Sequence, residues 1–191
     1  MKKIFFTTKK LVIREFNLDD LEDVHSYAND PEVCKYLTFC PNSIDKSKEY
    51  IQKNIAAQNT MPRTRYDLAI YHKKAEKVIG GIGLFIGDYK SAELGYILNK
   101  DFWGQGITTL SARILIEFGF EVLNLHRIWA TCNIDNRASE RVMIKCGMEK
   151  EGVLRDFLPI DGIWYDNFLY SIIENDKRQL PGNVIIESDF I

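Results

Sequence analysis

The sequence contains few of the features that are typical of a disulfide-stabilised, membrane-spanning or nucleic-acid-binding protein. Only four of its 191 residues are cysteine and five are proline, and no stretch approaches the roughly 20 apolar residues that span a bilayer. Neither sign of charge is in excess, because 25 Lys and Arg face 27 Asp and Glu, for a formal net charge of −2. Dedicated nucleic-acid binders usually carry a basic excess. We therefore expect a cytoplasmic protein whose partners include neither nucleic acid nor a membrane.

The cysteines show no metal-binding pattern. Cys34, Cys40, Cys132 and Cys146 form no C-x-x-C pair, and the nearest histidine, His126, lies six residues before Cys132. Structural zinc sites need more closely spaced ligands, so we expect no bound metal. A chain of this length buries roughly 70% of its unfolded surface and can build a core without disulfides. Reduced, mostly buried thiols are therefore expected.

What is present is the composition of an ordinary globular domain, with 46% hydrophobic and 27% charged residues. The length suits one domain. We place that domain at residues 1–175. We expect 176–191 to be a C-terminal tail, because Pro181 and Gly182 interrupt any regular element there.

Hydrophobic periodicity predicts alternating helices and strands. The clearest helix covers 107–123, in which apolar side chains repeat every fourth residue. The order of the elements is typical of an α/β (α+β) fold, with one β-α-β crossover from 92 to 133 whose two strands are parallel and whose hand is right. The other predicted helices cover 17–29, 43–59 and 136–146, and the predicted strands cover 10–16, 67–71, 78–86, 92–98, 127–133, 152–158 and 163–173.

A glycine turn lies between the predicted strand 92–98 and the predicted helix that follows it. It reads Trp103-Gly104-Gln105-Gly106. Glycines at such a turn let backbone N–H groups converge on one point, and the helix start adds a partial positive charge, which together form a phosphate cradle. The same pattern also occurs as plain turn chemistry. A P-loop is excluded because its lysine motif is missing, and a dinucleotide fingerprint lacks its third glycine, since that position is Thr109.

Five segments in register carry a family resemblance. They are AELGYIL at 92–98, KDFWGQGITT at 100–109, LNLHRIWATCNIDNRAS at 123–139, KCGMEKEGVLRD at 145–156 and DGIWYDNFLYSI at 161–172. Over residues 10–174 the chain resembles the GNAT N-acetyltransferase superfamily, in particular its ribosomal-protein N-terminal (alanine/serine) acetyltransferase branch. The resemblance implies a single GNAT-like domain, with a mixed, strongly bent sheet and helices on both faces. It also implies direct transfer of acetyl from acetyl-CoA to a primary amine.

The resemblance also implies where the coenzyme binds. The strand before the glycine turn would hold the pantetheine arm, and the turn would hold the pyrophosphate. A peptide-like arm suits an unpaired strand edge, which Gly95 could open as a bulge. Asp101 departs from the Gln or Arg that the family usually has there. The coenzyme-binding residues expected in this way are Tyr96, Ile97, Leu98, Gly104, Gln105, Gly106, Ile107, Thr108, Asn136 and Ser139.

Two residues are candidates for proton transfer. Glu93, in the family's AE-[LI]-G-Y pattern, is the candidate base, and a structural strand carboxylate is the alternative. Ser139 resembles the serine that this branch places near the coenzyme sulfur, and it could instead only cap a helix whose first residue follows Asn136. Thr131 and Met143 stand where some members carry a glutamate and a tyrosine, so the acid and base roles stay open.

The remaining candidates are weaker, and the acceptor stays open. The base position of another branch member falls near Leu158, which cannot titrate, and Asp156 would have to point inward. Neither Cys132 nor Cys146 has an adjacent histidine in the sequence to make it an obvious nucleophile. The expected acceptor is a protein N-terminal α-amine, and the alternative is a polyamine or another small amine. A non-catalytic CoA-binding sensor or partner protein is a second alternative, and a homodimer is left open.

Overall fold

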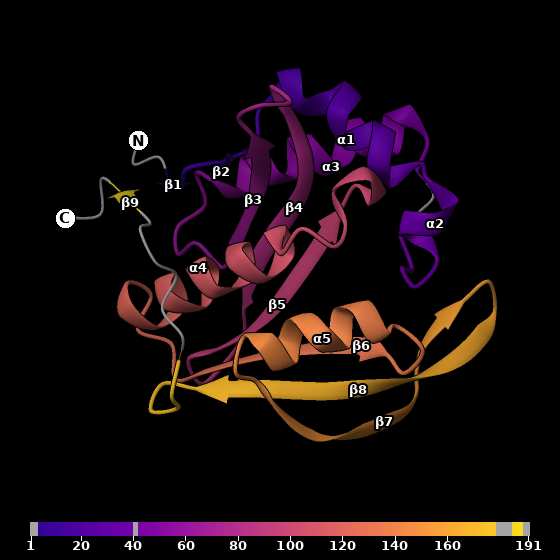
Figure 1. Cartoon of the computed structure of the whole chain (residues 1–191), viewed down its shortest axis with the longest axis vertical. Coiled ribbons are helices and arrows are strands. Elements are labelled where there is room, and N and C mark those ends of the chain that lie inside the picture. The colour runs from indigo at the N-terminus through magenta and orange to yellow at the C-terminus, as the bar shows by residue number, and fades with distance from the viewer. Residues whose placement is uncertain (1–3, 40–41, 179–184, 189–191) are drawn as a thin grey trace.

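The computed structural model describes residues 4–39, 42–178 and 185–188, which share one twisted sheet flanked by helices (Figure 1). The nine strands of this sheet follow the order β7-β8-β6-β5-β4-β3-β2-β1-β9. The strands are β1 (Ile4–Thr7), β2 (Leu11–Glu15), β3 (Arg65–His72), β4 (Lys77–Ile86), β5 (Ser91–Leu98), β6 (Arg127–Asn133), β7 (Glu149–Ile160), β8 (Ile163–Ile173) and β9 (Ile185–Ser188). The helices are α1 (Leu21–Ala28), α2 (Pro31–Cys34), α3 (Ile44–Ala57), α4 (Ile107–Glu121) and α5 (Arg137–Lys145), with short 3-10 turns at Leu18–Asp20 and Lys100–Phe102.

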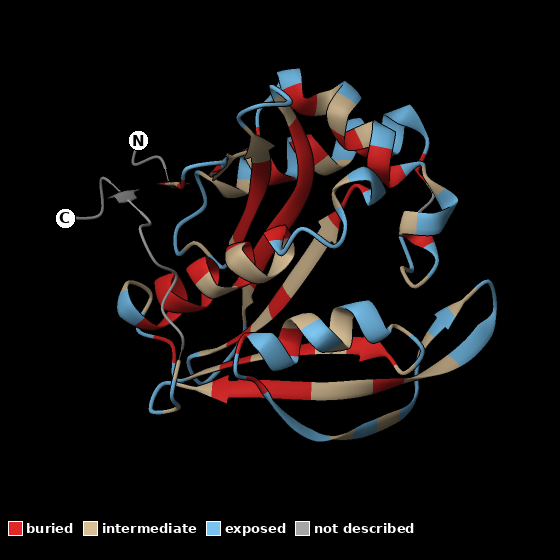
Figure 2. Cartoon of the chain, in the orientation of Figure 1, coloured by how far each residue is buried: buried red, intermediate tan, exposed pale blue. Residues whose placement is uncertain are grey.

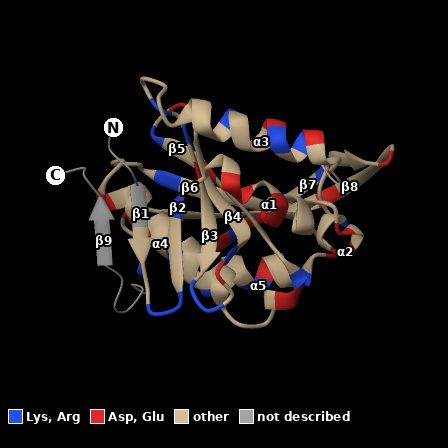
Figure 3. Cartoon of the chain, turned by 90° about the horizontal axis from the view of Figure 1, so that it is seen from above, with Lys and Arg blue, Asp and Glu red and all other residues tan. Residues whose placement is uncertain are grey.

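Helices cover both faces of the sheet, as the family resemblance implies. Alternation along β3 shows this, because Leu68 and Ile70 join the core under α4, whereas Ala69 between them joins the core under α1 and α3. Figure 2 shows buried residues along β3, β4 and the inner side of α4. Figure 3 shows both signs of charge interspersed along α3, so that helix presents no field of a single sign.

The sheet divides into two parts at β5 and β6. These two strands pair in parallel, which confirms the predicted crossover, but they pair only over Ser91–Glu93 and Arg127–Trp129. Beyond Glu93, β5 stays on β4 and β6 stays on β8, so the strands diverge. The backbone edge that this split leaves on the second half of β5 is the feature that positions the candidate site.

The predicted bulge at Gly95 is wrong. The pairing of β4 with β5 runs through Gly83 and Gly95 without a shift in register, so the edge opens through strand divergence instead. The shift occurs between β3 and β4, where Ile70 pairs with Gly80 and the next residue of β3 pairs with Val78. A Cβ at Gly80 would overlap the carbonyl oxygen of Ile97, so close backbone approach explains that glycine.

Three elements were missed in the sequence. Pro31 is the first residue of α2, a position where proline needs no N–H, and the Asp30 side chain caps this helix. β1 is short, with four residues. β9 lies inside the expected tail 176–191 and pairs with β1, so this stretch contains a strand of the sheet. Pro181 and Gly182, on which that expectation rested, lie outside the described residues.

The cysteines divide into two groups. Cys132 and Cys146 are free and buried, as expected. Cys34 is disulfide-bonded, which contradicts the expectation of a reduced thiol, because spacing in the sequence does not fix which sulfur atoms come together in the fold. The expectation for Cys40 lies outside the described residues. Across the described ranges, no helix is long and apolar enough to cross a bilayer, and no three His, Cys, Asp or Glu side chains gather as metal ligands would.

Candidate active site

The glycine turn joins β5 to α4 and faces open space. Gly104 and Gly106 have φ values of +74° and +75°, in the left-handed region that favours glycine. A Cβ built on either residue would meet no atom of the described chain within 4 Å. Gly106 also begins α4 without a side-chain cap, so the first N–H groups of the helix remain available. This open arrangement of donors has room for a pyrophosphate, the group that the sequence analysis expects here.

Anchoring contacts hold this turn on the end of β5. The Trp103 indole Nε1 donates to the carbonyl oxygen of Leu98 at 2.8 Å, and the Asn99 side chain accepts from the Asp101 backbone N–H at 3.0 Å. Ile107 is buried in the core under α4, whereas Thr108 is half-buried and Gln105 is exposed. Side chains on the two sides of the turn therefore fix the backbone, while the glycines themselves stay open.

Tyr96 and Ser139 meet across the split. The Tyr96 hydroxyl lies 2.8 Å from Ser139 Oγ and donates to the Ser139 carbonyl oxygen at 3.1 Å. Ser139 is the third residue of α5, and its backbone N–H donates to Asn136 Oδ1 at 3.1 Å, so Asn136 caps the helix. Burial raises the pKa of Tyr96 well above the ordinary value, so its hydroxyl stays protonated. The sequence named all three residues, but nothing in it indicated this contact over 43 positions.

Glu93 lies on the other face of β5. Alternation along the strand puts Tyr96 and Leu98 toward the core under α4, and puts Ile97 toward the core under α1 and α3. Glu93 shares the side of Ile97 and is the last β5 residue paired to β6. Burial raises its pKa above the ordinary value, and within the described part of the chain its carboxylate has no hydrogen-bond or ion-pair partner. This carboxylate is thus available to accept a proton, but the structure separates it from Ser139.

The positions that depart from the family pattern carry no acid or base. Thr131 Oγ1 only accepts a 3.5 Å hydrogen bond from Asn167, and Met143 is fully buried. Asp156 is exposed and lies in an irregular stretch of β7, where its φ is +47°. Among the positions that the sequence singled out for proton transfer, Glu93 and Ser139 therefore remain as candidates.

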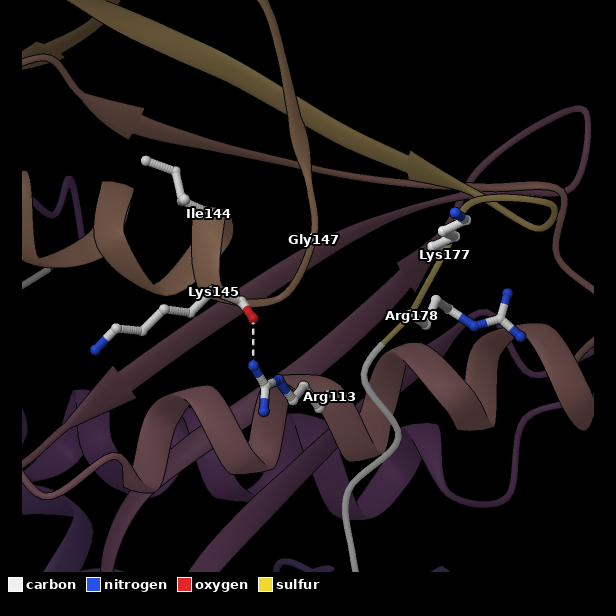
Figure 4. A pocket seen from close by; sticks show the side chains of 6 residues that line it. All are labelled: Arg113, Ile144, Lys145, Gly147, Lys177 and Arg178. Atoms are coloured by element: carbon white, nitrogen blue, oxygen red, sulfur yellow. Dashed lines mark hydrogen bonds between the residues drawn. The ribbon is translucent and has the colours of Figure 1, made fainter.

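A basic cavity of about 480 Å³ lies between α4, the C-terminal end of α5 and the segment that carries Lys177 and Arg178 (Figure 4). Arg113 of α4 donates from Nη2 to the Lys145 carbonyl oxygen at 2.5 Å, at the end of α5. Arg178 instead pairs with Glu117 and Glu121 of α4, at 2.8 and 3.0 Å. Figure 4 shows the Lys145 and Lys177 side chains extending in different directions, so the cations of this cavity do not converge on one point.

Comparisons with known proteins agree on the family. A model described as "Acetyltransferase (GNAT) domain" matches residues 10–149. The chain is 32% identical over 172 residues to the uncharacterized N-acetyltransferase YnaD of Bacillus subtilis (strain 168), covering 89% of this chain and 97% of that protein. It is 30% identical over 105 residues to the [Ribosomal protein uS5]-alanine N-acetyltransferase of Escherichia coli (strain K12), covering 53% and 54%.

Solved structures share the whole fold. A GNAT-family acetyltransferase from Bacillus anthracis superposes with a TM-score of 0.80 at 28% identity, covering 90% of this chain and 99% of that one. The microcin C7 self-immunity acetyltransferase MccE, solved in complex with acetyl-CoA and AMP, superposes with a TM-score of 0.76 at 26% identity, covering 87% and 93%. Given the family match over most of the chain, the split sheet and the open glycine turn, this protein belongs to the GNAT acetyltransferases and is an acetyl-CoA-dependent N-acetyltransferase.

Proposed function

We propose that this enzyme acetylates the α-amine of a protein or peptide N-terminus, with Glu93 as the base. The observation that carries the proposal is the half-buried carboxylate of Glu93 beside the split, which has no partner among the described residues, with Thr131 and Met143 in place of titrating groups. An α-amine has a pKa of about 7.7–8.0, so roughly a fifth to a third of it is neutral near pH 7.4. A lysine amine, at about 10.4, is neutral roughly one time in a thousand. A site with one weak base therefore favours the α-amine.

The donor supplies the acetyl group as a thioester, and the chain supplies position and protons. The turn amides of Gly104 to Thr108 would hold the pyrophosphate, and the open edge of Tyr96, Ile97 and Leu98 would hold the pantetheine arm. Asn136 and Ser139 would contact that arm from α5. Glu93 would take the proton that the amine loses when its nitrogen bonds to the carbonyl carbon. Direct transfer suits the free thiols, because burial raises the pKa of both Cys132 and Cys146 to about 11 and keeps them protonated.

A peptide with a free N-terminus and one internal lysine tests the acceptor class. Mass spectrometry should map the acetyl group mainly to the α-amine, and an N-terminally blocked copy of the peptide should react far more slowly. Acetyl found mainly on the lysine would contradict the proposal. Rapid turnover of spermidine without modification of any peptide would assign the acceptor to the small amines. Tight acetyl-CoA binding without turnover of any amine would indicate a sensor.

A further inference from the structure

The hydroxyl pair of Tyr96 and Ser139 has a geometry that capping alone does not need. Asn136 already satisfies the Ser139 N–H, so the cap of α5 is complete without the Ser139 side chain. We propose that Tyr96 is a positioning residue, which turns the proton of the Ser139 hydroxyl toward the leaving sulfur of the acetyl donor. The inference rests on the proposed role of Ser139 beside that sulfur, and it adds a function for Tyr96.

The two distances allow two arrangements of the same protons. A tyrosine hydroxyl has one proton to donate. When Tyr96 donates it to the Ser139 carbonyl oxygen, at 3.1 Å, the serine hydroxyl donates back to Tyr96 at 2.8 Å. When Tyr96 donates instead to Ser139 Oγ, the serine O–H no longer bonds to Tyr96 and can point toward another acceptor. Only the second arrangement offers a hydrogen bond to a sulfur atom in the split.

The surroundings keep both groups neutral and fixed. Tyr96 packs against the core under α4, and its hydroxyl is bonded only to Ser139 within the described ranges. The titrating groups that act electrostatically on it are the Cys132 and Cys146 thiols, which burial keeps protonated. Within the described residues, no ionised side chain forms a hydrogen bond with either hydroxyl, and a preorganised donor costs no reorganisation during the reaction.

The step balances as follows in terms of bonds and protons. The amine nitrogen bonds to the acetyl carbonyl carbon, the carbon–sulfur bond breaks, and its electron pair stays on sulfur. The Ser139 hydroxyl donates a hydrogen bond to that sulfur while Tyr96 donates to Ser139 Oγ. The amine proton leaves through Glu93 to solvent, and the thiolate takes one proton from solvent, so an amine and a thioester become an amide and a thiol.

In the arrangement proposed, Tyr96 acts through Ser139, and we call this pair the relay. Non-additivity of two substitutions tests it. Ser139→Ala should lower kcat about a hundredfold and Tyr96→Phe about tenfold, with the affinity for acetyl-CoA measured by calorimetry changing less than threefold. In the relay, Tyr96 acts only through Ser139. The double variant should therefore lose about a hundredfold, as Ser139→Ala does, rather than about a thousandfold. Ser139→Thr, which keeps the hydroxyl, should restore most of the rate. Tyr66→Phe, at another buried tyrosine of the sheet, is the matched control and should retain the wild-type kcat.

Other outcomes would overturn the relay and leave the proposal of an α-amine acceptor unchanged. A double variant with the product of the two single losses would make Tyr96 independent of Ser139. A Tyr96→Phe variant that loses stability and coenzyme affinity but keeps its kcat would show that Tyr96 has only a packing role. Should Tyr96→Phe fail to fold, 3-fluorotyrosine at position 96 keeps the shape and makes the hydroxyl a stronger donor, so kcat should rise at least twofold. An unchanged kcat there would reject the proposal.

Discussion

The glycine turn and the split between β5 and β6 are neighbours in the fold but are built in opposite ways. The turn is contiguous in sequence, and Gly104 and Gly106 have positive φ values and open space where a side chain would stand. The split brings side chains together from distant segments, with Tyr96 and Ser139 meeting over 43 positions. The turn depends on the absence of side chains at its glycines, whereas the split depends on the side-chain groups that meet there. Substitutions should therefore remove binding at the turn and rate at the split.

The largest effect is expected at the turn. Gly106→Val should weaken acetyl-CoA binding at least a hundredfold, because a β-branched residue disfavours φ of +75° and its side chain would fill the space that faces the phosphates. Isothermal calorimetry on the folded variant measures this loss. Gly162→Val is the matched control, since Gly162 also has a positive φ, +80°, and an open Cβ position, but lies in the β7–β8 turn. Normal coenzyme affinity in a folded Gly106→Val protein would remove the turn from the site.

At the split, Glu93→Gln should lower kcat about a hundredfold near pH 7 while leaving acetyl-CoA affinity unchanged. Burial raises the pKa of Glu93, so the wild-type rate should fall as the pH drops through that raised value and the carboxylate gains a proton. The Gln variant has no carboxylate at position 93, so its rate should not show the fall that protonation of Glu93 causes. Its deficit should narrow above the pKa of the acceptor amine, where the amine is already neutral.

A pH–rate profile of both proteins measures that pattern. Glu22→Gln, on the exposed first turn of α1, is the control and should keep the wild-type profile. A loss in the Glu93→Gln variant that is uniform at every pH would make Glu93 a structural strand residue instead.

The smallest effect separates capping from coenzyme contact. Asn136→Ala should cost about 1 kcal/mol in the free energy of unfolding, through loss of the α5 cap, and should also weaken acetyl-CoA several-fold. Ser43→Ala removes the cap of α3, where the Ser43 side chain accepts from the Lys46 N–H, and should cost stability alone. Urea unfolding and calorimetry on both variants provide the comparison. Equal coenzyme affinity in the two would leave Asn136 with only its capping role.

Local patterns predicted most of the elements. Strands 127–133 and 163–173 begin and end where expected, and helix 107–123 ends within two residues of its expected end, because alternation and helical spacing report directly on burial. The glycine turn was also visible, since positive φ at two glycines is a property of a few adjacent residues. The elements that the sequence did not predict are short or form only with a partner that is distant in the sequence. β9, for instance, forms only by pairing with β1.

The sequence alone determined most of the elements, the parallel crossover and the position of the glycine turn. Each of these follows from the spacing of residues that are close along the chain. Only the tertiary structure decided that β5 and β6 part after Glu93 and that Tyr96 reaches Ser139. Those outcomes depend on how helices pack against a twisted sheet, an interaction between segments that no local pattern encodes.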